Sequence, residues 1–151
     1  MRLYPPVWVI SRSAIEDDEI GGYHIPSGSE ILIFPYITHR HPAWWPDPEE
    51  FRPERFAPEN SSSRMKCSYL PFGAGPRVCV GLNFAMTEIQ VVLALIVQNF
   101  RLSLPSGSGA VRPDPSVTLR PSPGLQLQLQ PHCPGDCGQR GLENSKLGRK
   151  V

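Results

Sequence analysis

The sequence predicts a fold in which short β-strands and a proline-rich meander precede one long helix and a terminal β-hairpin. Its 151 residues include 18 prolines and 13 glycines, which interrupt regular structure often. Residues 82–100 contain neither and are largely apolar. Alternating apolar and polar residues then return at 117–120 and 125–130. A chain of this length can bury the core of one small domain, which we expect over residues 1–130.

Short strands are expected in the first 35 residues. Residues 7–10 are apolar and follow a Pro-Pro turn, so they predict a strand. Between 15 and 28, a Gly-Gly pair and a Pro-Ser-Gly turn predict a hairpin in which residues 23–25 form one strand. A further strand is expected at 30–34, where Pro35 ends it.

The next segment is expected to form an ordered meander. Residues 36–41 predict a short helical piece, which a proline then ends. The prolines between 42 and 71 exclude a long regular element there. The polar run at 60–64 predicts a mobile loop tip. The buried anchors expected in the meander are its large aromatic residues: Trp44, Trp45, Phe51 and Phe56.

The strongest chemical signal lies in the ten residues from 72 to 81, FGAGPRVCVG. They place Cys79 in a glycine-rich loop directly before the long helix. A metal-ligating cysteine must be deprotonated, and the first N–H groups of a helix favour an anion ahead of them. Gly73, Gly75 and Gly81 would let backbone N–H groups approach the sulfur closely. The loop therefore predicts a thiolate directed at a flat, anionic cofactor such as haem.

Two further side chains of this loop suit such a cofactor. The guanidinium of Arg77 is a forked donor that matches a carboxylate, as in a haem propionate. Phe72 would shield the sulfur from water. The alternative, a buried structural cysteine in a turn, leaves the glycines and Arg77 unexplained.

Residues 82–100 are expected to form one helix, about 28 Å long at ~1.5 Å per residue. The run Val91–Val97 is apolar on all sides, which is typical of a helix buried on most sides. This chain holds little to cover it, so we expect an exposed apolar surface and a tendency to aggregate. The two alternating strands that follow are expected to pair with each other through the turn at 121–124.

The last residues, 131–151, predict an unstructured basic tail. Its four Lys and Arg residues are too few and too dispersed to indicate a partner. Cys133 and Cys137 lie in it beside His132. Three ligands from one short segment, with no second ligand pair, are a weak basis for a zinc site. Cys67, in a polar stretch before the loop, has no expected role.

The loop matches the pattern F-x-x-G-x-R-x-C-x-G at all six fixed positions, and so it resembles the haem-binding signature of the cytochrome P450 family. The resemblance implies a fold class that is mainly α with small β-sheets, as the C-terminal part of the cytochrome P450 fold. It implies haem b as cofactor and Cys79 as the metal ligand. The residues that it places around the haem are Phe72, Gly75, Arg77, Cys79 and Gly81.

The resemblance extends upstream of the loop. The segment at 51–56, FRPERF, is similar to the family's F-x-P-E-R-F, and Arg2 stands where the family's E-x-x-R motif has its arginine. The Glu of that motif would lie two positions before Met1. The resemblance therefore implies that Arg2 and Arg55 are two cations without their usual carboxylate, which Glu54 would replace only in part. The alternative for Arg2 is a solvated terminal residue.

Arg12 is a further candidate for the cofactor site. It lies ten residues after Arg2 and just past the apolar run at 7–10. In similar family members an arginine at this spacing often pairs with a haem propionate, and the preceding apolar run often faces the substrate. The alternative is an ordinary strand with a surface arginine.

The resemblance implies a haem-thiolate monooxygenase that inserts one oxygen atom from O2 into an apolar small molecule. Electrons would come from a reductase or a ferredoxin. The similarity covers only the C-terminal part of a typical member, without the helix that lines the oxygen side of the haem, and no catalytic residue is assigned. Two alternatives stay open: a truncated, non-catalytic remnant that cannot enclose haem, and a haem-binding or electron-transfer module that uses thiolate ligation alone.

Composition argues against several other classes of partner. A net charge of +1 gives no electrostatic case for nucleic acid. The longest apolar run has seven residues, against the roughly 20 of a membrane-spanning helix, so no membrane segment is expected in this chain. The first 15 residues lack the pattern of a signal peptide. On these grounds we expect a cytoplasmic protein.

Overall fold

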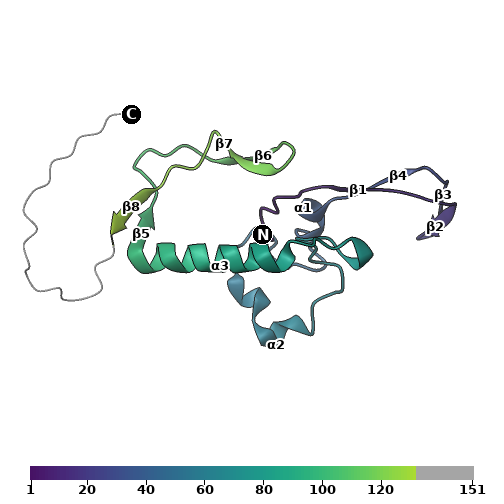
Figure 1. The fold of residues 1–151 in the computed structure, drawn as a ribbon, viewed down its shortest axis with the longest axis horizontal. Coiled ribbons are helices and arrows are strands. Elements are labelled where there is room, and N and C mark those ends of the chain that lie inside the picture. Colours follow the sequence, from purple (N-terminus) through teal and green to yellow (C-terminus); the bar gives the residue numbers. More distant parts are fainter. Residues whose placement is uncertain (132–151) are drawn as a thin grey trace, which may run out of the picture. The chain divides into compact units, whose positions relative to one another are not determined.

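The computed structural model describes residues 1–131, and the chain forms two compact units. The first unit comprises Met1–Ala85 and Gly109–Leu125. The second comprises Met86–Ser108 and the residues from Gln126 onward. Each unit thus joins segments that are distant in sequence (Figure 1). The tail predicted at 131–151 lies, but for its first residue, outside the described residues.

The first unit opens with two small antiparallel strand pairs. Strand β1 (Ile10–Ser13) pairs with β4 (Glu30–Ile33), and β2 (Asp18–Ile20) pairs with β3 (Tyr23–Ile25). The turn between β2 and β3 is the Gly-Gly pair, whose φ angles of +59° and +85° suit a tight hairpin turn that needs two positive φ values. The predicted hairpin and the strand at 30–34 are confirmed.

The strand predicted at 7–10 begins only at Ile10, because the backbone before it has other partners. The carbonyl of Pro6 accepts a hydrogen bond from the N–H of Leu119 at 2.9 Å. The indole N–H of Trp8 donates to the carbonyl of Ser116 at 2.8 Å. These contacts connect the N-terminal segment with a segment more than a hundred residues later in the same unit.

The proline-rich segment contains only short helical pieces, as predicted. They are α1 (Pro35–Thr38), the 3-10 helix η1 (Pro53–Phe56) and α2 (Pro58–Ser61), and a proline stands at the start of each. Proline is favoured there because its missing N–H would have no partner inside the helix. Part of the predicted loop tip at 60–64 therefore lies in α2.

Of the four predicted anchors of the meander, only Trp45 is buried, with 3% of its surface exposed. Trp44, Phe51 and Phe56 are all exposed, and Phe51 reaches 82%. The prediction is confirmed for Trp45 and was wrong for the other three, because aromatic identity does not say which side of an irregular segment faces inward. Much of the buried interior of this unit is instead polar or proline: Arg2, Pro5, Pro35, His39 and Ser68.

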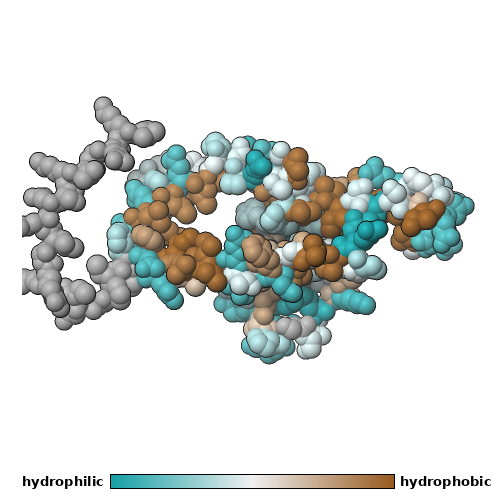
Figure 2. All heavy atoms as spheres, viewed as in Figure 1, coloured by the Kyte–Doolittle hydropathy of each residue, from teal (hydrophilic) through white to brown (hydrophobic). Residues whose placement is uncertain are grey.

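The long helix α3 (Leu82–Asn99) lies where the sequence predicts a helix, and Phe100 already begins the next strand. No residue of α3 is buried among the described residues, so the structure lacks the burial typical of such a helix there. The expected exposed apolar surface is confirmed, and it forms the brown patch over the C-terminal half of α3 (Figure 2). The exposed large side chains along the whole of α3 are Phe84, Ile89, Val91, Val92, Leu93, Leu95 and Val97.

By length and composition, α3 is also apolar enough to cross a membrane, a test that core helices of soluble proteins pass as well. The sequence argument considered only uninterrupted apolar runs and so did not single out this helix. The absence of a membrane segment therefore stays a prediction.

The C-terminal strands pair differently from the prediction. Strand β5 (Phe100–Ser103) pairs with β8 (Gln128–Pro131), and β6 (Arg112–Pro115) pairs with β7 (Leu119–Ser122). The predicted hairpin would have paired β7 with β8, so it was wrong. Alternation of apolar and polar residues identifies a strand but not its partner.

Candidate functional site

The loop before α3 is held by hydrogen bonds between its own backbone groups. A single 3-10 turn, η2 (Gly75–Arg77), forms its centre. The N–H of Val78 donates to the carbonyl of Gly75 at 3.1 Å, which closes that turn. The N–H of Cys79 donates to the carbonyl of Phe72 at 2.9 Å, which brings the two ends of the loop together.

Glycine is required by the backbone at two positions of this loop. Gly73 and Gly75 have φ angles of +74° and +69°, in the left-handed region that other residues rarely adopt. Gly81 borders the sulfur, since a Cβ placed there would lie in ordinary van der Waals contact with the Sγ of Cys79, at 3.8 Å. The absence of a side chain at Gly81 leaves the space beside the sulfur open.

Cys79 presents a free, exposed thiol at this opening. Its carbonyl accepts a hydrogen bond from the N–H of Leu82 at 3.3 Å, so the sulfur stands just ahead of the first turn of α3. The start of a helix stabilises a thiolate. An exposed sulfur, a glycine-lined opening and a helix start together fit a haem iron. Cys67 is also free and exposed, but it lies in a turn at φ +67° and not before a helix of this length.

The loop brings together all the site residues predicted within it. Phe72 is half-buried, and Arg77 is exposed, with no hydrogen bond or ion pair from its side chain to the rest of residues 1–131. The guanidinium of Arg77 is therefore available to a ligand carboxylate.

Arg12 lies outside the loop, on β1, where its Nη1 donates to the carbonyl of Ser11 at 2.7 Å. The strand itself touches the loop, because a Cβ built on Gly73 would lie 4.0 Å from the Cδ1 of Ile10. Residues two apart on a strand share a face, so Arg12 stands on the side of β1 that meets the loop.

Arg2 is buried rather than solvated. Its Nη1 donates to the carbonyls of His39 at 2.9 Å and Pro48 at 2.6 Å, and its Nη2 donates to that of Glu50 at 2.8 Å. Burial, and then the neighbouring Arg55, lower the pKa of this guanidinium. Backbone carbonyls therefore accept the hydrogen bonds of Arg2 that the resemblance assigns to a carboxylate.

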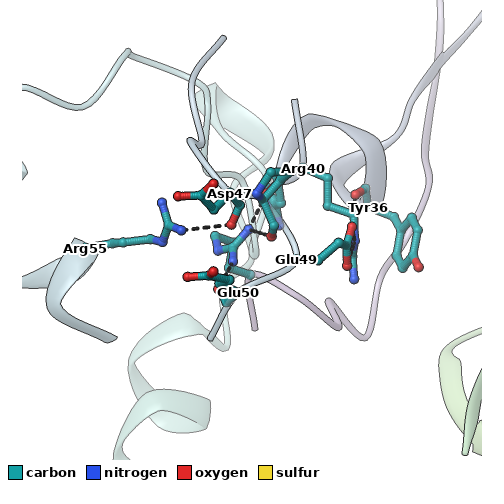
Figure 3. A network of polar contacts seen from close by, with 9 residues as sticks. Tyr36, Arg40, Asp47, Glu49, Glu50 and Arg55 are labelled. Carbon is teal, nitrogen blue, oxygen red and sulfur yellow. Dashed lines mark hydrogen bonds and ion pairs between the residues drawn. The ribbon is translucent and has the colours of Figure 1, made fainter. Parts of the chain in front are cut away.

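Arg55 is likewise held by a carbonyl, since its Nη2 donates to that of Asp47 at 2.9 Å (Figure 3). Its Nε is buried and has no partner among residues 1–131. Glu54 forms no ion pair in that part of the chain, so the partial replacement of a carboxylate expected of it is not observed.

Arg40 is a well-packed cation that the sequence analysis did not single out. Its Nε lies 2.9 Å from a carboxylate oxygen of Glu49, and its guanidinium lies over the ring of Tyr36 at 3.9 Å (Figure 3). The ring of Tyr4 contacts the same guanidinium at 5.6 Å. Arg40 thus connects α1 with the meander that follows it.

His39, which the sequence analysis did not select, is fully buried. Its Nε2 accepts a hydrogen bond from the N–H of Leu70 at 2.8 Å, so the proton of the neutral ring is assigned to Nδ1. Burial lowers the pKa of His39 to about 4. Interaction with the backbone of Arg2 opposes this shift in pKa, while the charges of the N-terminus, Arg2 and Arg40 add to it. No signal in the sequence pointed to this role, because the contact joins segments 31 positions apart.

An apolar cavity of about 330 Å³ in the first unit is lined by side chains from the segment before β1, from the start of α1 and from β6 and β7. Trp8 and Phe34 lie on one side of it, with ring centroids 6.2 Å apart, and Leu119 also lines it. Trp8 belongs to the apolar run that the resemblance places near substrate. Within residues 1–131, no group of three His, Cys, Asp or Glu side chains could hold a metal ion, and the segment with Cys133 and Cys137 lies outside them.

Comparison with known proteins places these features in one family. A family model described as Cytochrome P450 matches residues 1–129. Cytochrome P450 4V2 of Mus musculus is 43% identical over 130 residues, which make up 86% of this chain and 25% of that protein. An ultra-long-chain fatty acid omega-hydroxylase of Homo sapiens is 43% identical over 132 residues, 87% of this chain and 25% of that protein.

The fold agrees with solved structures. The crystal structure of the cytochrome P450DA heme domain has a TM-score of 0.81 and 34% sequence identity to this chain, covering 88% of it and 29% of the solved chain. This similarity confirms the predicted fold class. The chain spans about a quarter of the length of the curated relatives that it matches. With a family model over residues 1–129 and relatives of this identity, the chain belongs to the cytochrome P450 family.

Proposed function

We propose that this chain is the haem-binding C-terminal part of a haem-thiolate monooxygenase, with Cys79 as the iron ligand of haem b. The observation that carries the proposal is the free, exposed thiol of Cys79 in a glycine-lined opening directly before α3. When bound, the haem would activate O2 for the insertion of one oxygen atom into a substrate.

Each residue of the loop has a separate task in this proposal. Cys79 would supply the iron ligand from its place just ahead of the first turn of α3. Arg77 binds one haem propionate through its free guanidinium, and Arg12 approaches another from β1. Phe72 would shield the sulfur from water once haem is bound. Gly75 and Gly81 keep the opening free of side chains.

We infer an apolar small molecule as substrate, with electrons supplied by a reductase or a ferredoxin. The cavity lined by Trp8, Phe34 and Leu119 supports an apolar ligand, because cavities with such linings favour apolar groups. The human relative is an ultra-long-chain fatty acid omega-hydroxylase, and its name agrees with this class of substrate.

Adding haemin to the purified 151-residue chain tests the ligand assignment. The unmodified chain and Cys67→Ser, which removes the other exposed free thiol, are expected to give a thiolate-type ferrous–CO spectrum. Cys79→Ser is expected to lose that spectrum. Retention of the spectrum in Cys79→Ser would show that another residue is the ligand. Its absence from the unmodified chain would refute haem binding by these residues.

A further inference from the structure

We propose that His39 is a positioning residue for the Cys79 loop, because its buried imidazole holds the backbone at Leu70, from which the loop leaves. The inference rests on the proposed role of Cys79 as haem ligand. It assigns a task to a side chain that lies 31 positions before Leu70 and outside the cysteine loop.

The contact itself is short and specific. The Nε2 of His39 accepts a hydrogen bond from the N–H of Leu70 at 2.8 Å, and the His39 side chain is fully buried. The ring of Tyr69 lies 5.0 Å from the imidazole ring, centroid to centroid. A neutral imidazole offers a single acceptor nitrogen, and here that nitrogen points at one backbone amide.

His39 is itself held firmly by its backbone. Its N–H donates to the carbonyl of Pro35 at 2.8 Å, which fixes it at the end of α1. Its carbonyl accepts the hydrogen bond from Nη1 of Arg2 at 2.9 Å. These two bonds fix the backbone of His39. The hydrogen bond from its imidazole then fixes the N–H of Leu70 in turn.

Further hydrogen bonds lead from Leu70 to the cysteine. The carbonyl of Leu70 accepts from the N–H of Gly73 at 3.2 Å, where the loop adopts its positive φ angle. The carbonyl of Phe72 accepts from the N–H of Cys79 at 2.9 Å. A displacement of Leu70 would thus be passed on to the backbone that carries the sulfur.

A second buried side chain holds the same segment. The indole N–H of Trp45 donates to the carbonyl of Ser68 at 3.2 Å, and Ser68 is buried. Trp45 supplies much of the local packing, whereas His39 supplies an acceptor for one amide. An apolar side chain could fill the space of His39 but would leave the N–H of Leu70 without its partner.

Two polar variants separate positioning from packing. In His39→Gln the amide oxygen can take the place of Nε2, whereas in His39→Asn the shorter side chain does not reach Leu70. Amide hydrogen exchange is measured on the chain without haem. In His39→Asn the amides of Leu70, Gly73 and Cys79 are expected to exchange about tenfold faster, the factor that roughly one lost hydrogen bond gives. In His39→Gln the exchange rates of these amides are expected to stay close to those of the unmodified chain.

The matched control is His24→Asn, which changes an exposed histidine on β3. It is expected to leave all three amides unchanged. Equal exchange at Cys79 in His39→Gln and His39→Asn would overturn the proposal, whether both resemble the unmodified chain or both unfold.

A spectroscopic measurement on the same variants tests the link to the cofactor. After addition of haemin, His39→Asn is expected to show a smaller thiolate-type fraction of the ferrous–CO spectrum, and His39→Gln is expected to restore it. An unchanged fraction in His39→Asn would overturn the positioning role. Because the exchange experiment contains no haem, a failure of haem binding would refute the proposed function without altering the exchange result.

Discussion

At the scale of single residues, Arg2 shows how a buried cation is satisfied without a carboxylate. Its guanidinium donates to three backbone carbonyls, two of them in the meander at 48–50. Several separate carbonyls suit the planar guanidinium of an arginine, which has five N–H donors, better than they suit the ammonium group of a lysine. Arg2 therefore joins the start of the chain to the meander and, through the carbonyl of His39, to the support of the cysteine loop.

The buried His39 makes the stability of the first unit depend on pH. Its pKa is about 4 in the folded chain, against about 6.5 for an unfolded histidine. At pH values between about 4 and 6.5, His39 is protonated in the unfolded chain but neutral in the folded chain. The stabilisation is therefore complete above about pH 6.5 and is lost as the pH falls towards 4. From pH 7.5 to pH 5 we expect a loss of about 2 kcal/mol in the free energy of unfolding.

Urea unfolding followed by tryptophan fluorescence at the two pH values measures this loss. His39→Gln removes the titrating group but keeps the acceptor, so its stability is expected to change less between pH 7.5 and pH 5. The difference between the two chains isolates His39 from the carboxylates and from the N-terminus. Identical pH dependence in both chains would contradict the assignment of a neutral, buried histidine.

At the scale of elements, the sequence predicted correctly those features that local signals determine. The Gly21-Gly22 pair specifies a tight turn, and β2 and β3 form on either side of it. The absence of glycine and proline from 82 to 100 predicted α3 to within one residue. The cysteine loop was found from its residue pattern, and its predicted members lie together because they are adjacent in the chain.

Features that depend on distant contacts were missed. The strand at 128–131 pairs with residues 100–103, not with its nearer neighbour, because pairing depends on the arrangement of the backbone and not on alternation alone. The contact of His39 with Leu70 joins two segments 31 positions apart, and nothing in the residue types links them. Likewise, the packing of Ile10 near Gly73 could not be read from either segment alone.

The turn before Cys79 offers a test of backbone strain in this loop. Gly75 has a φ of +69°, and a Cβ placed on it would meet no atom within 4 Å. Gly75→Ala is therefore expected to cost about 1 kcal/mol of stability through the left-handed backbone alone. Gly109→Ala is the control, since its site is equally open and its φ is not positive. That change is expected to be neutral or to stabilise by a few tenths of a kcal/mol.

Urea unfolding of both alanine variants gives the comparison. Because neither new methyl group meets a neighbour, any difference in the free energy of unfolding reports the backbone and not packing. Equal stabilities would mean that the loop can adopt another conformation at Gly75 without cost. In that case the conformation of the loop before Cys79 would not depend on glycine at position 75.

At the scale of the whole molecule, the chain exposes a surface that its composition would normally bury. It spans about a quarter of its relatives' length, and α3 has no buried residue in the described part of the chain. Leu93 and Val97 are one helical turn apart and therefore share a face, and both are more than half exposed. Contiguous apolar patches of this kind promote association between molecules.

Replacing two of these side chains tests whether α3 governs self-association. Leu93→Glu/Val97→Glu places two charges on one apolar face, and light scattering at a fixed protein concentration is expected to fall several-fold. Binding of an apolar fluorescent dye is expected to fall with it, because both signals come from the same exposed surface. Gln98→Glu adds a charge at an exposed polar position of α3 and serves as the control. If scattering stays as high in the double variant as in the control, association depends on another surface, such as the apolar cavity beside Trp8.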